Sequence, residues 1–251
     1  MSDVLERLRI KLFADGADRS QIAALASDRR ISGFTTNPTL MRKAGVDDYR
    51  AFARDALALV GDRPISFEVI ADEFDAMERQ ALELASWGDH VYVKIPVTDP
   101  DGDPSTKLLD RLAHEGVRLN VTAILTLGQV ASVVETLRDG PPCLVSVFAG
   151  RIADAGRDPV PMMAAAAEIV HSTANAELLW ASPREVLNVV QADEVGCDVI
   201  TLTDDVLVKL PLLGRDLAEF SLETVRMFYE DAAAAGFVID QGALGARTAG
   251  G

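Results

Sequence analysis

The 251-residue chain predicts an α/β protein, a single-domain (β/α)8 (TIM) barrel with an additional C-terminal helix. Short apolar runs rich in β-forming residues alternate along the chain with amphipathic or alanine-rich stretches. Gly, Pro, Asp and Asn stand at most of the junctions between them. Eight such strand–helix units, each of about 30 residues, match a barrel of this kind in both number and length.

The strands are expected where apolar runs are bounded by turn residues. In chain order they are residues 10–14, 33–36, 64–69, 90–95, 117–123, 143–148, 177–181 and 197–202. Helices are expected between them, at residues 20–29, 47–60, 73–87, 105–116, 126–139, 160–172 and 183–196. Apolar residues there recur at three- and four-residue intervals, as in Phe74, Met77, Ala81 and Leu84, which predicts one buried helix face.

An open, doubly wound sheet is the alternative fold, because counting elements does not show that the sheet closes. No GxGxxG or GxxxxGK[ST] motif follows the first strand, which disfavours the nucleotide-binding forms of that alternative. No linker divides the chain. Residues 1–236 are therefore expected to form one domain that includes a last helix at 217–236, and residues 237–251 a flexible tail.

The net charge of −15 and the pI of about 4.6 argue against nucleic acid or an anionic membrane as a partner. They do not exclude a small anionic substrate, because a few local arginines can outweigh a distant acidic surface. Cys143 and Cys197 are far apart and are expected to be reduced thiols. With no signal-peptide core and no apolar run long enough to cross a membrane, we expect a cytoplasmic protein.

No metal or cofactor site is predicted. The three histidines and two cysteines show no spacing typical of zinc ligands. The stretch DPDGDPSTKLLD resembles a calcium loop, but Pro104 stands where the turn of such a loop needs glycine. No G-x-S-x-G motif is present either. The chemistry is therefore expected to use an organic nucleophile.

Polar residues interrupt the predicted strands, mostly near their C-terminal ends. Strands of a parallel barrel are covered on both faces and should be almost wholly apolar. The exceptions at or just after strands are Asp15, Asn37, Glu68, Lys94, Asn120, Thr122, Ser146, Arg151, Ser182 and Arg184. Alternate residues share a face, and the other face is almost entirely aliphatic, so we expect the polar set to line the barrel mouth, where such enzymes form their sites.

Each of these residues alone has an ordinary structural explanation. Lys94 would extend its ammonium group to solvent, and Asp15 would end a strand or cap a helix. Asn37 before Pro38 would form a turn, with Thr39 capping the next segment of the chain. Glu68 is harder to explain in this way, because an unpaired buried carboxylate is costly.

Together, the polar residues suit a reaction that uses a lysine amine. Burial favours the neutral, nucleophilic form of an amine, and such an amine forms a Schiff base with a ketose carbonyl. The protonated imine then draws electrons from the adjacent carbon–carbon bond, while carboxylates move the protons. Lys94 is the candidate nucleophile, Asp15 and Glu68 are the candidate carboxylates, and arginines after strands suit a phosphate.

The motifs LFADGAD, GFTTNPTL, SFEV, VYVKIPVT, LNVTAIL, SVFAGRI and LLWASPRE resemble the transaldolase family in order and spacing. The resemblance spans about residues 10 to 210 and is most specific in TTNP and VKIPVT. In length, the chain resembles the short branch, which also includes the fructose-6-phosphate aldolases. The resemblance implies a (β/α)8 barrel with the Schiff-base lysine on its fourth strand, where the strand count also puts Lys94.

The resemblance further implies a role for each site residue. Asp15 would be the acid and base for carbon–carbon cleavage, and Glu68 and Thr122 would hold a proton-shuttling water. The remaining residues would bind substrate: the dihydroxyacetone hydroxyls at Asn37, Asn120 and Ser146, the pocket wall at Phe148, and the phosphate at Arg151, Ser182 and Arg184. The implied partners are sugar phosphates and, as in ring-forming relatives, further copies of the chain.

Two positions favour a transferase over an aldolase. Aldolases of the short branch typically carry glutamine at the position of Glu68 and tyrosine at that of Phe148, whereas this chain has the transaldolase residue at both. A fructose-6-phosphate aldolase that releases dihydroxyacetone, and a sugar-phosphate-binding protein without turnover, are the alternatives. Pro183 departs from the phenylalanine usual in classical members, which puts the contact between Arg184 and phosphate in doubt.

Overall fold

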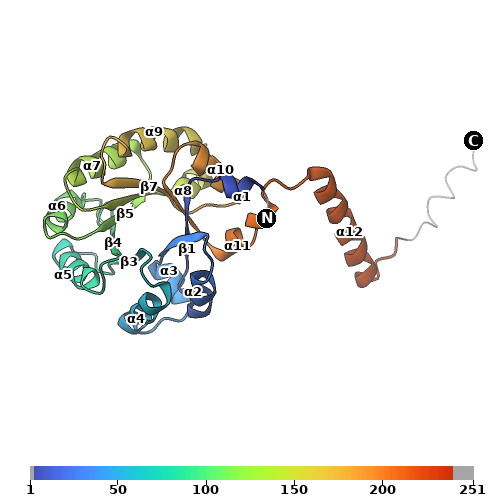
Figure 1. Ribbon diagram of the computed structural model, residues 1–251, viewed down its shortest axis with the longest axis horizontal. Coiled ribbons are helices and arrows are strands. Elements are labelled where there is room, and N and C mark those ends of the chain that lie inside the picture. The colour runs from blue at the N-terminus through green and yellow to red at the C-terminus, as the bar shows by residue number, and fades with distance from the viewer. Residues whose placement is uncertain (1–2, 240–251) are drawn as a thin grey trace, which may run out of the picture.

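The computed structural model describes residues 3–239 and contains a closed barrel of eight parallel strands in sequence order (Figure 1). The strands are β1 (Lys11–Asp15), β2 (Ile31–Thr35), β3 (Ile65–Glu68), β4 (Val91–Pro96), β5 (Leu119–Ile124), β6 (Cys143–Val147), β7 (Ala176–Trp180) and β8 (Val199–Leu202). All eight overlap the predicted runs, and pairing of β1 with β8 closes the sheet. The predicted (β/α)8 barrel is therefore confirmed, and the open sheet is excluded.

The long helices surround the barrel where the apolar periodicity predicts them. They are α2 (Arg19–Ala26), α4 (Tyr49–Val60), α5 (Phe74–Ala85), α6 (Thr106–His114), α7 (Leu127–Leu137), α9 (Val160–Val170) and α10 (Leu187–Glu194). Short segments that the sequence patterns do not predict are α1 (Asp3–Arg7), α3 (Pro38–Lys43), α8 (Ala149–Asp154), α11 (Asp204–Leu207) and a 3-10 turn at Leu210–Leu212. Of these, α3, α8 and α11 begin just after strands, so they shape the barrel mouth.

Two apolar clusters form the core, one on each side of the barrel wall. Val93, Ile95, Val121 and Val145 belong to the large cluster between strands and helices. A small cluster fills the barrel interior; its buried members are Phe13, Leu144, Leu179, Ala181 and Val199. The polar residues of β4 to β6 therefore point into the barrel, above this interior cluster.

The last helix, α12 (Leu217–Ala235), lies apart from the barrel (Figure 1). None of its residues is buried, and large apolar side chains such as Phe228 and Tyr229 are 62% and 76% exposed. Within residues 3–239, no helix combines the length and the apolar character needed to cross a bilayer. Most of the tail predicted from residue 237, namely residues 240–251, lies outside the described residues.

Gly33 on β2 leaves room for the Phe13 ring in the barrel interior. A Cβ at Gly33 would lie 2.5 to 2.8 Å from three ring atoms of Phe13. We predict that Gly33→Ala lowers the free energy of unfolding by about 1–3 kcal/mol, the usual cost of overpacking. Gly128→Ala in α7 is the control: its Cβ meets nothing within 4 Å, so stability should not fall. Equal urea midpoints for wild type and Gly33→Ala would contradict this packing constraint.

Candidate functional site

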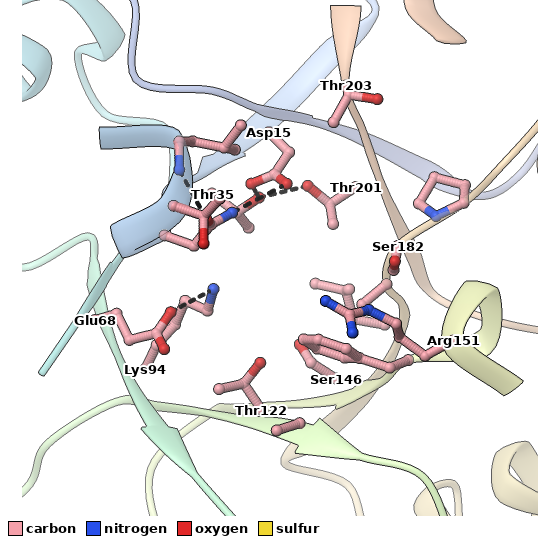
Figure 2. Close-up of a pocket in the computed structure, with 18 of the residues that line it drawn as sticks. Asp15, Thr35, Glu68, Lys94, Thr122, Ser146, Arg151, Ser182, Thr201 and Thr203 are labelled. Carbon is pink, nitrogen blue, oxygen red and sulfur yellow. Dashed lines mark hydrogen bonds and ion pairs between the residues drawn. The ribbon is translucent and has the colours of Figure 1, made fainter. Parts of the chain in front are cut away.

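A cavity of about 500 Å³ opens at the carboxyl ends of the barrel strands (Figure 2). Every site residue predicted from the sequence lines it: Asp15, Asn37, Glu68, Lys94, Asn120, Thr122, Ser146, Phe148, Arg151, Ser182 and Arg184. The volume is typical of a site for a small organic ligand. The structure thus brings together in one cavity residues that are up to 169 positions apart in the sequence.

Lys94 lines the cavity and is only 7% exposed. Its Nζ lies 2.9 Å from a carboxylate oxygen of Glu68, on the neighbouring strand β3 (Figure 2). The same Nζ donates a hydrogen bond of 2.9 Å to the backbone carbonyl of Thr36, just after β2. Because Glu68 is within direct contact of the amine, it can accept a proton from Lys94 or return one to it.

Asp15 ends β1 and lines the same cavity. Its carboxylate accepts hydrogen bonds from the Thr35 hydroxyl at 2.7 Å and from the Asn37 amide at 3.5 Å. Burial raises the pKa of Asp15, and the nearby positive charge of Lys94 only partly opposes this. A carboxyl group with a raised pKa holds and releases a proton closer to neutral pH, which suits an acid–base group.

Two buried hydrogen bonds fix the wall formed by β5 and β6. The Asn120 amide donates to the Ser66 hydroxyl at 3.0 Å, and the Ser146 hydroxyl donates to the Asn120 carbonyl oxygen at 2.6 Å. The Thr122 hydroxyl, also buried, has no hydrogen-bond partner among the described residues. Since unpaired buried hydroxyls are uncommon, Thr122 is suited to bind a group that enters the cavity.

The far side of the cavity carries the arginines. Arg151 extends from α8 into the cavity, near Ser182 (Figure 2). Arg184 instead forms a two-pronged ion pair with Asp154, with Nε 3.0 Å from one carboxylate oxygen. This pairing lowers the pKa of Asp154. The positive charge of Arg184 is therefore largely matched by Asp154, whereas that of Arg151 faces the cavity.

The loops after β6 and β7 contact each other very closely. Ser182 has a positive φ of 61°, which is uncommon for a residue with a side chain. A Cβ at Gly150 would lie 1.5 Å from the carbonyl oxygen of Ser182, so position 150 accommodates only glycine without a shift of the backbone. Arg184 is held by its backbone N–H, which donates to Asn188 at 2.8 Å. Ser182 and the two arginines therefore share one rigid frame.

The sequence patterns did not identify four polar residues that line the cavity, and they indicated the wrong cap for the helix beside it. Thr35, Thr201, Thr203 and Asp205 line the cavity, and the Thr35 and Thr201 hydroxyls are hydrogen-bonded to each other. Thr201 is a polar residue within the apolar run of β8, just as Thr122 is within that of β5, so the sequence pattern could have identified it. The expected cap at Thr39 was wrong: the Asn37 side chain caps α3 by accepting from the Leu40 N–H at 3.0 Å.

Comparisons with known proteins agree with this architecture. A sequence model of the family "Transaldolase/Fructose-6-phosphate aldolase" matches residues 12–245. A "Probable transaldolase" of Dehalococcoides mccartyi is 31% identical over 215 residues, 84% of this chain and 96% of that protein. Another from Nitrosopumilus maritimus is 32% identical over 216 residues, 85% of this chain and 92% of that protein.

A solved structure, titled as a putative phosphonomutase from Burkholderia cenocepacia, aligns with a TM-score of 0.54 at 11% identity. It covers 91% of this chain and 97% of its own, and this likeness bears on the fold alone. The fold and cavity define a TIM-barrel protein with its site at the carboxyl ends of the strands. The family match then identifies the group more narrowly: the chain belongs to the transaldolase/fructose-6-phosphate aldolase family.

Asp15 should lower the stability of the folded chain at neutral pH. Because folding raises the pKa of Asp15, ionised Asp15 destabilises the folded state. This destabilisation is absent below about pH 3.8 and grows as pH rises through the folded-state pKa. We predict that Asp15→Asn raises the free energy of unfolding by about 1 kcal/mol at pH 8, with a smaller gain at pH 4.5.

Urea unfolding at the two pH values measures this difference. Asp18→Asn is the matched control, because hydrogen bonds from Ser20 and the Gln21 N–H lower the pKa of Asp18. That substitution should bring no gain at pH 8. A gain for Asp15→Asn that is independent of pH would contradict the assignment of the penalty to ionisation.

Proposed function

We propose that the protein is a transaldolase that forms a Schiff base at Lys94. It transfers a dihydroxyacetone unit from a ketose phosphate, fructose 6-phosphate or sedoheptulose 7-phosphate, to an aldose phosphate. The observation that carries the proposal is the buried Lys94 amine in direct contact with Glu68, in a cavity that also contains Asp15 and Arg151. We place this reaction in the cytoplasm, within the non-oxidative pentose phosphate pathway.

The first half of the reaction joins the substrate to Lys94. The ammonium gives a proton to Glu68, and the neutral amine attacks the ketose carbonyl to form a carbinolamine. Loss of water then gives the protonated imine. Glu68 lies 2.9 Å from Nζ, and the unpartnered Thr122 hydroxyl lines the same cavity. We assign these two residues to the proton transfers, with a water molecule between them.

The second half breaks the bond between the third and fourth carbons of the ketose. Asp15 takes the proton from the hydroxyl on the fourth carbon, the aldose leaves as an aldehyde, and the bonding electrons form an enamine on Lys94. The enamine then attacks the acceptor aldehyde, and Asp15 returns the proton. The raised pKa of Asp15 and its place in the same cavity, within electrostatic range of Lys94, support this role.

The other cavity residues would bind the two ends of the substrate. We assign the hydroxyls of the dihydroxyacetone unit to Asn37, Asn120 and Ser146 and the phosphate to Arg151, Ser182 and Arg184, with Phe148 lining the pocket. Arg151 would make the stronger phosphate contact, because Asp154 already pairs with Arg184. The phenyl ring of Phe148 has no hydroxyl to activate water, so the enamine would persist until an acceptor arrives.

Incubation with fructose 6-phosphate, with and without erythrose 4-phosphate, tests the transferase. We expect sedoheptulose 7-phosphate with the acceptor and little free dihydroxyacetone without it. Borohydride should trap the substrate on Lys94, as read by peptide mass. Lys94→Ala should abolish trapping, whereas Lys209→Ala, at an exposed lysine of the 3-10 turn region, should not. Dihydroxyacetone release at equal rates with or without acceptor would indicate an aldolase, and absence of trapping would indicate binding without turnover.

We also propose that the chain forms a homo-oligomer through α12. The helix has no buried residue, and its large apolar side chains include Leu217, Val225, Phe228 and Tyr229, each at least 59% exposed. An exposed apolar surface of this kind is typical of an interface, and the resemblance to ring-forming relatives implies further copies of the chain. The occupant we propose is a second copy of this chain.

Light scattering after size exclusion tests the assembly. We expect a mass that is a multiple of the 26.9 kDa chain for the wild type. A Val225→Asp/Phe228→Asp double variant should shift the mass towards that of one chain. Asp231→Asn, on the same helix at an exposed polar residue, is the control and should leave the mass unchanged. A monomeric wild type at 1 mg/ml or above would contradict the proposal.

A further inference from the structure

The hydroxyl of Tyr49, at the start of α4, bonds twice to the backbone of Glu68. It donates to the Glu68 carbonyl oxygen and accepts from the Glu68 N–H, each at 2.9 Å. The ring is held edge-on to Phe67 and Trp87, with centroids 6.2 and 5.8 Å away. Sequence reasoning attached no function to Tyr49, and none of the proposed chemical steps uses it.

Glu68 needs these bonds because β2 stops pairing with β3 just before it. The ladder between these strands includes bonds from the Phe34 N–H to Pro64 at 2.9 Å and from the Thr36 N–H to Ser66 at 3.1 Å. The next bond in this register would run from the N–H of residue 38 to the Glu68 carbonyl. Residue 38 is proline, which has no N–H to give.

The second hydrogen bond of this ladder step, from the Glu68 N–H to the Thr36 carbonyl, is missing as well. In a parallel ladder, the Glu68 N–H would donate to the Thr36 carbonyl. That carbonyl instead accepts the hydrogen bond from Lys94 Nζ. Both backbone groups of Glu68 would therefore lack a strand partner, and the Tyr49 hydroxyl supplies a donor to one and an acceptor to the other.

The Tyr49 hydroxyl thus bears on both partners of the Lys94 amine. It holds the backbone of Glu68, whose carboxylate contacts Nζ, and it occupies the Glu68 N–H that would otherwise point at the Thr36 carbonyl. Burial raises the pKa of Tyr49, which keeps the hydroxyl protonated and able to donate. Without the hydroxyl, the free Glu68 N–H would turn to the Thr36 carbonyl and compete with Lys94 for it.

We propose that Tyr49 is a positioning residue that substitutes for a β2–β3 ladder step, fixes Glu68 and leaves the Thr36 carbonyl free to orient Lys94. This inference rests on the proposed Schiff-base function. Misplacement of reacting groups by about 1 Å can reduce the rate by a factor of about 100. Loss of the hydroxyl should accordingly slow imine formation without weakening phosphate binding, because Arg151 lies on the opposite side of the cavity from Glu68 (Figure 2).

Tyr49→Phe tests the inference, because it removes the hydroxyl and keeps the ring. We expect kcat to fall roughly 10- to 100-fold while KM for fructose 6-phosphate changes less than about twofold. The rate of borohydride trapping at Lys94, per competent site, should fall by the same factor. The peptide covering residues 65–71 should exchange its backbone hydrogens faster. Tyr92→Phe is the matched control, since Tyr92 lines a separate cavity at the opposite end of the barrel.

The outcomes separate this inference from the proposed function. If wild type is not trapped at Lys94, the proposed function fails. If wild type is trapped and Tyr49→Phe matches it in kcat and trapping rate, the positioning role of Tyr49 is overturned. Normalising to the number of competent sites, counted by the final extent of trapping, removes the effect of any misfolded fraction. A fall in kcat shared equally by Tyr92→Phe would also overturn the inference, because it would be a general stability effect.

Discussion

The contact between Lys94 and Glu68 is the interaction on which the site depends. Moving two charges out of water is costly unless they meet at close range and their remaining valences are satisfied. Here Lys94 Nζ lies 2.9 Å from the Glu68 carboxylate and 2.9 Å from the Thr36 carbonyl oxygen. The carboxyl ends of β2, β3 and β4 must therefore lie at matching heights along the barrel. A closed barrel fixes those heights, because each strand is held on both sides by its neighbours.

The opposite side of the mouth is organised by a different constraint, close backbone contact. Gly150 lies against the carbonyl oxygen of Ser182, and Ser182 adopts a left-handed conformation. Asp154, one turn along α8 from Arg151, fixes Arg184 from the neighbouring loop. The cavity therefore combines a densely hydrogen-bonded side around Lys94 and Asp15 with a rigid rim that carries positive charge. Such a separation suits a substrate with a reactive carbonyl at one end and an anionic group at the other.

Much of the fold and part of the site were predictable from the sequence, because they follow from local patterns of residues. The eight strands and seven of the surrounding helices show period-two or period-3.6 apolar spacing, and Glu68 and Lys94 stand out as charges within apolar strands. The helices α3, α8 and α11 are too short to show periodicity. The pairing of Asp154, at the end of α8, with Arg184, in the loop after β7, joins residues 30 positions apart, so no local pattern indicates it. Pro183 raised doubt about the phosphate contact of Arg184, and that contact stays a prediction.

The shortness of the β2–β3 pairing connects the fold to the chemistry. Only Phe34 and Thr35 pair in register with β3, and the chain then turns at Pro38 into α3. A fully paired ladder would also direct the Glu68 N–H at the Thr36 carbonyl, which would then be shared with the Lys94 amine that it holds across the width of β3. The barrel thus gives up sheet hydrogen bonds at the point where the Thr36 carbonyl holds the Lys94 amine. A side chain from α4 restores the missing bonds, so the helix layer, as well as the strands, determines where the Lys94 amine lies.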